Sequence, residues 1–188
     1  MEAGLDEAGR GCLAGPVYAA AVILPKDYKH LKLNDSKKLT PRLREELRKE
    51  IEKQAVDFAV ASVSNEEIDE INIYNASYKA MHLAIEKLSA PPQLLLVDGN
   101  KFIPYKQLPY HCIVKGDGIY YSIAAASVLA KTYRDEFMAK IHLEHPEYDW
   151  LRNKGYGTKA HVQALMEHGR TPYHRKSFNV KAQLKMDL

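Results

Sequence analysis

The segment GLDEAGRGCLAGP occupies residues 4–16 and is followed by an apolar run over residues 17–24. This pattern predicts one strand over residues 3–6 and a second over the apolar run, joined by a glycine-rich turn as a hairpin-like pair. Asp6-Glu7 closes the first strand, and Arg10 follows inside the turn. Carboxylates suit a hard cation, whereas glycine N–H groups and a guanidinium suit phosphate. The carboxylates would repel a phosphate that the glycine N–H groups and the guanidinium attract. A divalent cation between the carboxylates and the phosphate resolves this conflict, so the segment indicates phosphoryl-transfer chemistry.

Strands and helices alternate along the rest of the chain. Thr40-Pro41 and Ser64 are typical helix starts. Residues 94–97 are apolar on both faces, which favours an interior strand. The whole pattern predicts strands over residues 58–63, 93–98 and 111–114, and helices from residues 40 and 64 and over residues 74–88 (with Tyr74 in the apolar stripe), 122–141 and 158–167. A crossover between residues 58 and 98 would set the fourth strand beside the first in a mixed α/β sheet.

Two more acids follow the later strands. Asp98 ends the fourth strand and Asp117 precedes the long helix, each beside a glycine. By itself an Asp-Gly pair is more often a plain turn or cap. If the first and fourth strands are parallel neighbours, however, Asp6 and Asp98 lie within a few ångströms, and like charges that close need a cation or a shared proton. Oxygen-only ligands select Mg²⁺ or Mn²⁺ over zinc.

Glu7 presents a geometric difficulty, because consecutive residues of a strand point to opposite faces. Glu7 joins Asp6 at one site if the strand ends or bulges before it, or if it acts through water or its backbone carbonyl. The glycines that follow favour early termination of the strand.

The bulk properties fit one domain of 188 residues with a net charge of +3 and a pI near 8.7. Residues 152–188 hold eight basic residues against two acids, which permits a nucleic-acid partner or a plain solvated face. Two cysteines a hundred positions apart do not form a disulfide framework, so we expect a reduced, cytoplasmic protein. With no apolar run near the length of a membrane span and no signal-peptide pattern, we expect no membrane association.

The glycine-rich segment and later motifs resemble the ribonuclease HII family, the type 2 ribonucleases H of bacteria. The later motifs, in order, are NDSKKL at 34–39, VDGN at 97–100, VKGD at 114–117, SIAAAS at 122–127, AKTYRD at 130–135, KGYGT at 154–158 and HRKSF at 174–178. The resemblance covers nearly the whole chain. It implies a single catalytic domain over residues 1–188 with the ribonuclease H-like α/β fold: a central five-stranded mixed sheet flanked by helices, and a small basic helical extension over about residues 150–188.

The resemblance also implies an activity. It is metal-dependent hydrolysis of the RNA strand of RNA–DNA hybrids, and nicking of duplex DNA 5′ to an embedded ribonucleotide, as in ribonucleotide excision repair. The products carry a 5′-phosphate and a 3′-hydroxyl. The implied partners are these nucleic acids, and we expect a monomer. Two Mg²⁺ or Mn²⁺ ions are the implied cofactors, held by four catalytic acids: Asp6, Glu7, Asp98 and Asp117.

The resemblance also names substrate-binding residues. The backbone of Gly9, Arg10 and Gly11 would contact the ribose 2′-hydroxyl and its phosphate, the feature that separates RNA from DNA. Lys37 and Lys38 would neutralise phosphates. Tyr156, between two glycines, would detect the deoxyribose on the 3′ side of a ribonucleotide, although a surface tyrosine is the commoner reading of such a residue.

The remaining motif residues have structural interpretations. Residues 122–127 favour close helix–sheet packing, and Asp135 favours an ion pair within its helix. The histidines His142, His145, His161 and His168 lack metal-site spacing and are interpreted as solvated, whereas residues 174–176 belong to the basic extension. Cys12, beside Gly11, is a candidate for thiol-reagent sensitivity.

Two rival functions stay open at this point. A small-molecule phosphotransferase would use the glycine turn, but the chain lacks a Walker lysine motif after a strand. A non-catalytic nucleic-acid-binding module would keep the fold without the reaction, and the presence of all four acids argues against it.

Overall fold

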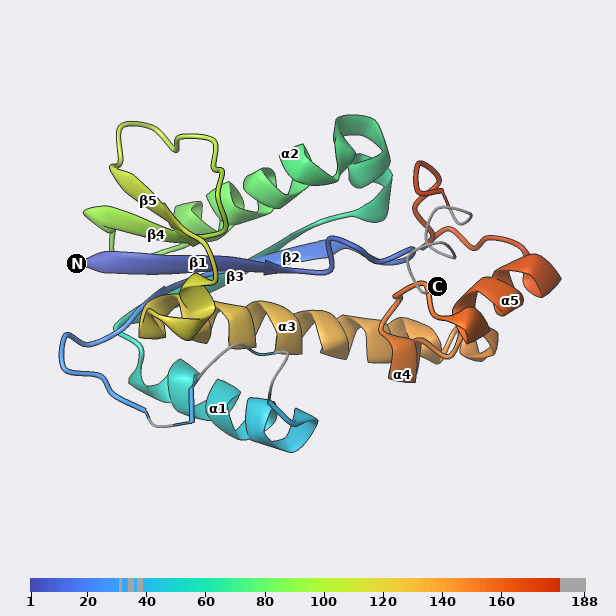
Figure 1. The fold of residues 1–188 in the computed structure, drawn as a ribbon, viewed down its shortest axis with the longest axis horizontal. Coiled ribbons are helices and arrows are strands. Elements are labelled where there is room, and N and C mark those ends of the chain that lie inside the picture. The colour runs from blue at the N-terminus through green and yellow to red at the C-terminus, as the bar shows by residue number, and fades with distance from the viewer. Residues whose placement is uncertain (31, 34–35, 37–38, 180–188) are drawn as a thin grey trace.

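A five-stranded mixed sheet forms the centre of the molecule (Figure 1). The computed structural model describes residues 1–30, 32–33, 36 and 39–179. The strands are β1 (Glu2–Ala8), β2 (Val17–Ile23), β3 (Asp57–Val63), β4 (Leu94–Asp98) and β5 (Tyr110–Ile113), in the spatial order β3-β2-β1-β4-β5. β1 pairs antiparallel with β2 and parallel with β4, so the predicted hairpin and the predicted crossover are both confirmed.

Helices cover both faces of this sheet. α2 (Asn65–Glu86) packs on one face, and α1 (Pro41–Gln54) with α3 (Tyr121–His142) on the other. Three predicted helix starts are confirmed, because Thr40, Ser64 and Thr158 each cap a helix by accepting a backbone N–H. Each face of the sheet therefore has its own buried apolar cluster, and the ribonuclease H-like α/β architecture is as expected.

The second helix departs from the regular stripe that its spacing predicts. Asn72 has φ 65° and ψ 164°, which breaks α2 into two parts. Its side-chain Oδ1 accepts the backbone N–H groups of Tyr74 and Asn75 at 3.0 and 3.1 Å and so caps the second part. The kink leaves Tyr74 59% exposed, so its assignment to the buried stripe is wrong, whereas Met81 and Ile85 are buried as expected.

Helix α3 lies unusually close to β1. A Cβ atom added to Gly4 would lie 2.1 Å from the carbonyl carbon of Ser122 and 2.3 Å from the backbone nitrogen of Ile123. Every residue from Ser122 to Ala130 is buried. The small side chains at the start of α3 thus permit backbone contact between helix and sheet, as the sequence predicts.

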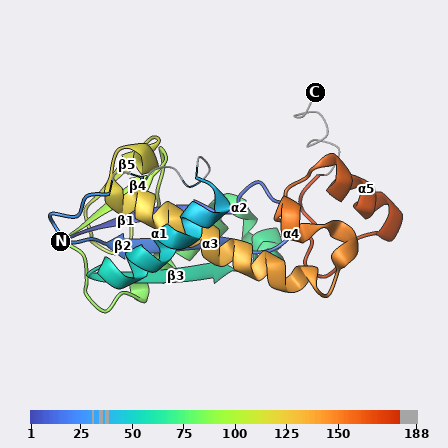
Figure 2. The same ribbon diagram turned by 90° about the horizontal axis from the view of Figure 1, so that it is seen from below.

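The C-terminal part continues from the far end of α3 (Figure 2). It contains two short elements, η2 (Pro146–Tyr148) and α4 (Trp150–Asn153), followed by α5 (Lys159–His168). A third apolar cluster, with Trp150 and Tyr148 at its centre, joins this part to Met138 of α3. No helix within the described ranges is long and apolar enough to cross a membrane.

Two interpretations of this C-terminal part are wrong. His161 and His174 are 0% and 1% exposed, so His161 is not a solvated histidine. Arg175 is 1% exposed and therefore is not part of a basic surface. Lys176, the next residue, is exposed as expected.

The contact between α3 and β1 gives a prediction about stability. Gly4→Ala should lower the free energy of unfolding by about 1–3 kcal/mol or more, because the methyl group overlaps backbone atoms that cannot rotate away. Gly11→Ala is the matched control, since a Cβ there meets nothing within 4 Å. Urea unfolding of both variants tests this, and equal stabilities would contradict the close contact.

Candidate active site

Asp6 and Asp98 lie side by side at the carboxyl ends of two parallel strands. Leu5 is paired with Val97 in the register of β1 and β4, so the acids that follow them are neighbours. Ala3, Leu5, Leu95 and Val97 pack in the cluster under α2, so the alternating positions that include both acids face α3. The predicted approach of these two carboxylates is therefore confirmed by the strand register.

Glu7 arrives by a route that differs from the expected one. β1 does not end before Glu7 but stays paired with β2 through Ala8. Glu7 thus points to the side of the sheet covered by α2, where Arg10 donates to its Oε1 at 3.1 Å. It nonetheless lines the same small cavity as Asp98, because the cavity lies at the rim where both faces of the sheet end. The expected end of the strand before Glu7 is therefore wrong. Glu7 reaches the cavity because it lies at the rim of the sheet.

Asp98 is connected to the segment that carries Asp117. The backbone N–H of Gly116 donates to Asp98 Oδ1 at 2.8 Å, and Gly116–Gly118 forms the short element η1. Asp117 thus directly follows Gly116, the residue whose backbone N–H donates to Asp98. Within the described residues no three acid, histidine or cysteine side chains already form a metal-ligand cluster.

The buried carboxyl group of Asp6 experiences opposing influences. It is 6% exposed, and burial raises the pKa of Asp6 well above its usual range, with the charges of Glu7 and Asp98 acting in the same direction. The Glu7 backbone N–H, 2.7 Å from Asp6 Oδ1, and the hydroxyl of Ser127 act against this rise. Ser127 in turn shares a hydrogen bond of 2.9 Å with Ser36. Burial and the two neighbouring acids therefore disfavour the charged form of Asp6 more than its two hydrogen bonds favour it.

Two buried arginines hold the glycine-rich loop. Arg175 donates from Nε to the carbonyl of Gly15 and from its two terminal nitrogens to the carbonyls of Arg10 and Gly9, at 3.0, 2.9 and 2.7 Å. Burial lowers the pKa of Arg175 to about 10, so it remains a cation at neutral pH.

The second arginine, Arg134, comes from α3 and is 0% exposed. It donates to the carbonyls of Pro16, Ala14 and Lys154 at 3.0, 3.0 and 2.8 Å. Gly9, with φ +98°, has no room for a side chain, because a Cβ would lie 2.0 Å from Arg134 Nε. The loop's carbonyl oxygens are therefore occupied by two guanidinium groups from distant parts of the chain.

Tyr156 lines the same cavity, beside the glycine-rich loop. It is 41% exposed, and Lys131 Nζ lies 6.0 Å from its ring centroid. Its backbone pairs with that of Cys12, and burial and the Cys12 thiol raise the pKa of Tyr156 to about 12. Cys12 itself is 0% exposed, which argues against ready modification of its thiol.

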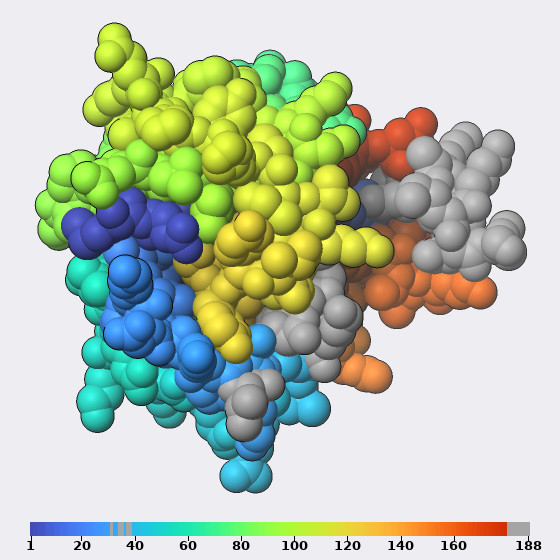
Figure 3. Space-filling model, turned by 60° about the vertical axis from the view of Figure 1, so that its left-hand side comes forward, coloured from blue at the N-terminus to red at the C-terminus, as the bar shows by residue number. Residues whose placement is uncertain are grey.

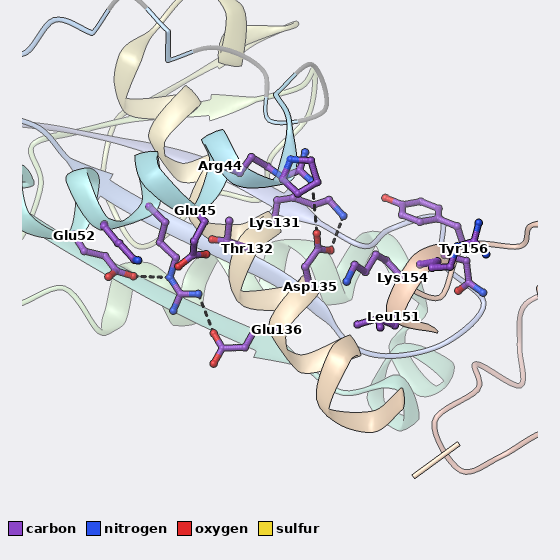
Figure 4. Close-up of a pocket in the computed structure, with 15 residues that line it drawn as sticks. Arg44, Glu45, Glu52, Lys131, Thr132, Asp135, Glu136, Leu151, Lys154 and Tyr156 are labelled. Atoms are coloured by element: carbon purple, nitrogen blue, oxygen red, sulfur yellow. Dashed lines mark hydrogen bonds and ion pairs between the residues drawn. The ribbon is translucent and has the colours of Figure 1, made fainter. Parts of the chain in front are cut away.

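A groove of about 950 Å³ continues from Tyr156 along α3 and between α1 and α4 (Figure 4). Most of its cations are paired: Lys131 with Asp135 at 2.5 Å, and Arg48 with Glu52 and Glu136 at 2.8 and 2.9 Å. Asp135 thus forms the ion pair within its helix that the sequence predicts, and its closest partner is Lys131. A separate hollow of about 650 Å³ lies at the opposite end of the sheet, bordered by Met1 and Tyr121 (Figure 3), away from the acids.

The structure thus brings together Asp6, Glu7 and Asp98, with the glycine loop beside them. Lys37 and Lys38 lie outside the described residues. Three residues at this site were not singled out from the sequence: Ser127, Arg134 and Arg175. Arg134 had a detectable signal, because it follows Ala130 and precedes Met138 at helical spacing on the buried stripe of α3.

Comparisons with known proteins agree with this geometry. A family model described as ribonuclease HII matches residues 3–181. The chain is 60% identical over 188 residues to a ribonuclease HII of Bacteroides thetaiotaomicron, covering 100% of this chain and 94% of that protein. It is 61% identical over 180 residues to a ribonuclease HII of Phocaeicola vulgatus, covering 96% and 90%.

Solved structures show the same fold. The crystal structure of ribonuclease H2 from Pyrococcus horikoshii has a TM-score of 0.81 and 25% identity, covering 99% of this chain and 97% of that one. The ribonuclease HII in a complex with PCNA from Archaeoglobus fulgidus has a TM-score of 0.78 and 27% identity, covering 96% and 97%. A Bst-RNase HIII structure with Mn²⁺, at 17% identity and a TM-score of 0.73 over 98% of this chain and 69% of that one, shows the fold alone.

The arginine contacts predict a large effect of one substitution. Arg175→Ala leaves the carbonyls of Gly9, Arg10 and Gly15 without these donors, and should lower the free energy of unfolding by about 3 kcal/mol or more. Lys176→Ala, at the exposed neighbouring residue, should change it by less than about 0.5 kcal/mol. The measurement is urea unfolding, and similar losses in both variants would show that the buried guanidinium is dispensable.

Proposed function

The chain belongs to the ribonuclease HII family, and we propose that Asp6, Glu7, Asp98 and Asp117 form its catalytic centre. As a ribonuclease HII it is an endoribonuclease that hydrolyses the RNA strand of RNA–DNA hybrids. The assignment of this centre rests on the pairing of Leu5 with Val97. This pairing puts two carboxylates together at the rim of the sheet, beside the glycine-rich loop.

The donor set fits divalent cations. The acids offer oxygen ligands alone. Burial, and after it the charges of Glu7 and Asp98, raise the pKa of Asp6, and a bound cation would oppose that rise. Mg²⁺ is commonly held by one or two carboxylates together with waters and substrate phosphate, so a preformed three-ligand cluster is not required. Two Mg²⁺ or Mn²⁺ ions would supply activated water and stabilise the leaving 3′-oxygen, giving 5′-phosphate and 3′-hydroxyl ends.

The residues around the acids supply substrate contacts in this proposal. The backbone of Gly9, Arg10 and Gly11 would approach the ribose 2′-hydroxyl and the adjoining phosphate, since Arg134 and Arg175 hold the loop in place. The Arg10 guanidinium donates to Glu7 at 3.1 Å and lies 5.1 Å from the Tyr74 ring centroid, and its remaining N–H groups would meet an incoming phosphate. Lys37 and Lys38 would add to this charge.

Tyr156 is proposed to recognise the junction between RNA and DNA. Its half-exposed ring lines the same cavity as the glycine-rich loop, so it would meet the sugar on the 3′ side of the ribonucleotide. This role would allow the enzyme to nick duplex DNA 5′ to a single embedded ribonucleotide, the first step of ribonucleotide excision repair.

In this proposal residues 1–188 form one catalytic domain, which includes the extension from about residue 150. The support is that Arg175 of the extension contacts the glycine-rich loop directly. A cytoplasmic location and a monomeric state stay predictions.

Asp98→Asn should reduce turnover of a labelled RNA–DNA hybrid by about 100-fold or more while the hybrid still binds. The amide is a poor ligand for a hard cation, and loss of several kcal/mol of charge stabilisation is worth tenfold in rate for each 1.4 kcal/mol. Asp27→Asn, the same change at an exposed loop position, should leave turnover unchanged. Near-normal activity of Asp98→Asn in Mg²⁺ and in Mn²⁺ would remove Asp98 from the centre.

Tyr156→Ala should reduce cleavage at a single ribonucleotide in duplex DNA by about tenfold more than cleavage of a long hybrid, because long hybrids present few junctions. Tyr120→Ala is a matched control, since Tyr120 is 40% exposed against 41% for Tyr156 but borders the hollow at the other end of the sheet. The kcat/KM ratio of the two substrates is the readout. A proportional loss on both would contradict junction recognition.

A further inference from the structure

Two buried histidines lie directly behind the loop that carries Tyr156. The Nε2 atoms of His161 and His174 are 3.1 Å apart, and Trp150 Nε1 lies 3.1 Å from the same nitrogen of His161. His161 Nδ1 is 2.9 Å from the backbone carbonyl oxygen of Tyr156. The pair therefore connects the interior of the C-terminal part to the residue proposed to recognise the junction.

The surrounding donors allow one arrangement of protons. The backbone N–H of Thr171 donates to His174 Nδ1 at 2.9 Å, so the neutral ring carries its proton on Nε2 and donates to His161. The Trp150 indole N–H also donates to His161 Nε2, so that nitrogen is an acceptor. The proton of His161 is thus on Nδ1, which donates to the Tyr156 carbonyl.

The environment supports neutral rings. Burial lowers the pKa of His174 to about 4, and the nearby His161, Arg170 and His145 act in the same direction. Burial likewise lowers the pKa of His161. A further proton on either ring would place two N–H groups opposite each other. The direction of the chain of hydrogen bonds is therefore fixed at neutral pH.

The backbone around Tyr156 depends on hydrogen bonds for its conformation, because glycines on both sides restrict it little. It lies between Gly155, with φ +83°, and Gly157. Its carbonyl also accepts the Thr158 backbone N–H at 2.8 Å, and its own N–H donates to the Asn153 carbonyl at 2.9 Å. Among these contacts, the one from His161 reaches Tyr156 from a rigid, buried side chain, since His161 belongs to α5 and is 0% exposed.

We infer that His161 is a positioning residue for substrate discrimination: its Nδ1–H, oriented by Trp150 and His174, holds the Tyr156 backbone so that the ring meets the sugar at the RNA–DNA junction. This inference rests on the proposed role of Tyr156. His161 is buried and acts through Tyr156, so its loss should alter the choice between substrates more than the hydrolysis of hybrids.

The test compares two amides at the same position. In His161→Asn the amide nitrogen takes the place of Nδ1 and can still donate to the Tyr156 carbonyl, whereas in His161→Gln it takes the place of Nε2 and cannot. Both variants lose the aromatic ring, so both should lose thermal stability to a similar degree. Assays are run well below the lower of the two Tm values.

The first readout is kcat/KM on a DNA duplex with one ribonucleotide divided by kcat/KM on a long hybrid. His161→Gln should lower this ratio by roughly tenfold, mainly through kcat, because a small displacement of a positioning group has effects of up to ~100-fold. His161→Asn should stay within about threefold of wild type. In a Tyr156→Ala background, His161→Gln should change the ratio no further, because both act through one ring. Equal ratios for the two amides would overturn the inference and leave His161 a packing residue.

The second readout separates this inference from the role of Tyr156. Hydrogen exchange of the Tyr156 and Thr158 amides reports how firmly the loop is held. Exchange should be faster in His161→Gln than in His161→Asn by roughly tenfold. If Tyr156→Ala leaves the substrate ratio unchanged, the junction role fails, and the exchange data still decide whether His161 holds the loop. Unchanged exchange in His161→Gln would overturn the anchoring.

Discussion

The burial of two guanidinium groups under the glycine-rich loop is the constraint on which the active site depends. A loop that presents its N–H groups to a substrate has carbonyl groups on its other side, and these need donors inside the protein. Arg134 and Arg175 supply them to five carbonyl groups between Gly9 and Pro16 and to that of Lys154. An arginine can do this without a carboxylate partner because its five N–H groups are spread over one plane.

The same constraint helps to explain how one cavity can be lined both by carboxylates and by the glycine-rich loop. Asp6 and Asp98 are fixed by the register of two parallel strands, independently of the loop. Glu7 and Arg10 are held at the start of the loop, and the arginines beneath it determine where that start lies. Asp6 and Asp98 are thus positioned by the sheet, whereas Glu7 is also tied to Arg10 of the loop by an ion pair.

Local patterns in the sequence predict most of the fold, because alternation, caps and glycine turns act over a few residues. Thr40, Ser64 and Thr158 show this, as does the crossover that brings Asp98 to Asp6. The incorrect predictions concern contacts between distant segments. Glu7 remains in the strand because residues 7 and 8 pair with residues 19 and 18, which the glycines after them do not reveal.

Charge predicted the wrong environment for Arg175, and the lack of metal-site spacing did so for His161, because both residues are buried. Their donors and acceptors come from segments more than a hundred residues away for Arg175, and from an irregular segment for His161. The kink at Asn72 similarly depends on a side chain that caps the following turn. Asp6 and Asp98 were therefore predictable as a pair, whereas the supports around them were not.

The parallel pairing of β1 with β4 has a consequence for biosynthesis. β1 is an interior strand, and its partner β4 is made some ninety residues later. The loop next to β1 acquires its last donors from Arg175 later still. Since domains gain their long-range contacts only when both segments exist, the proposed centre is completed only after Arg175 has been made. A nascent chain that stops before Arg175 would therefore carry the proposed catalytic acids beside a glycine-rich loop that lacks these donors.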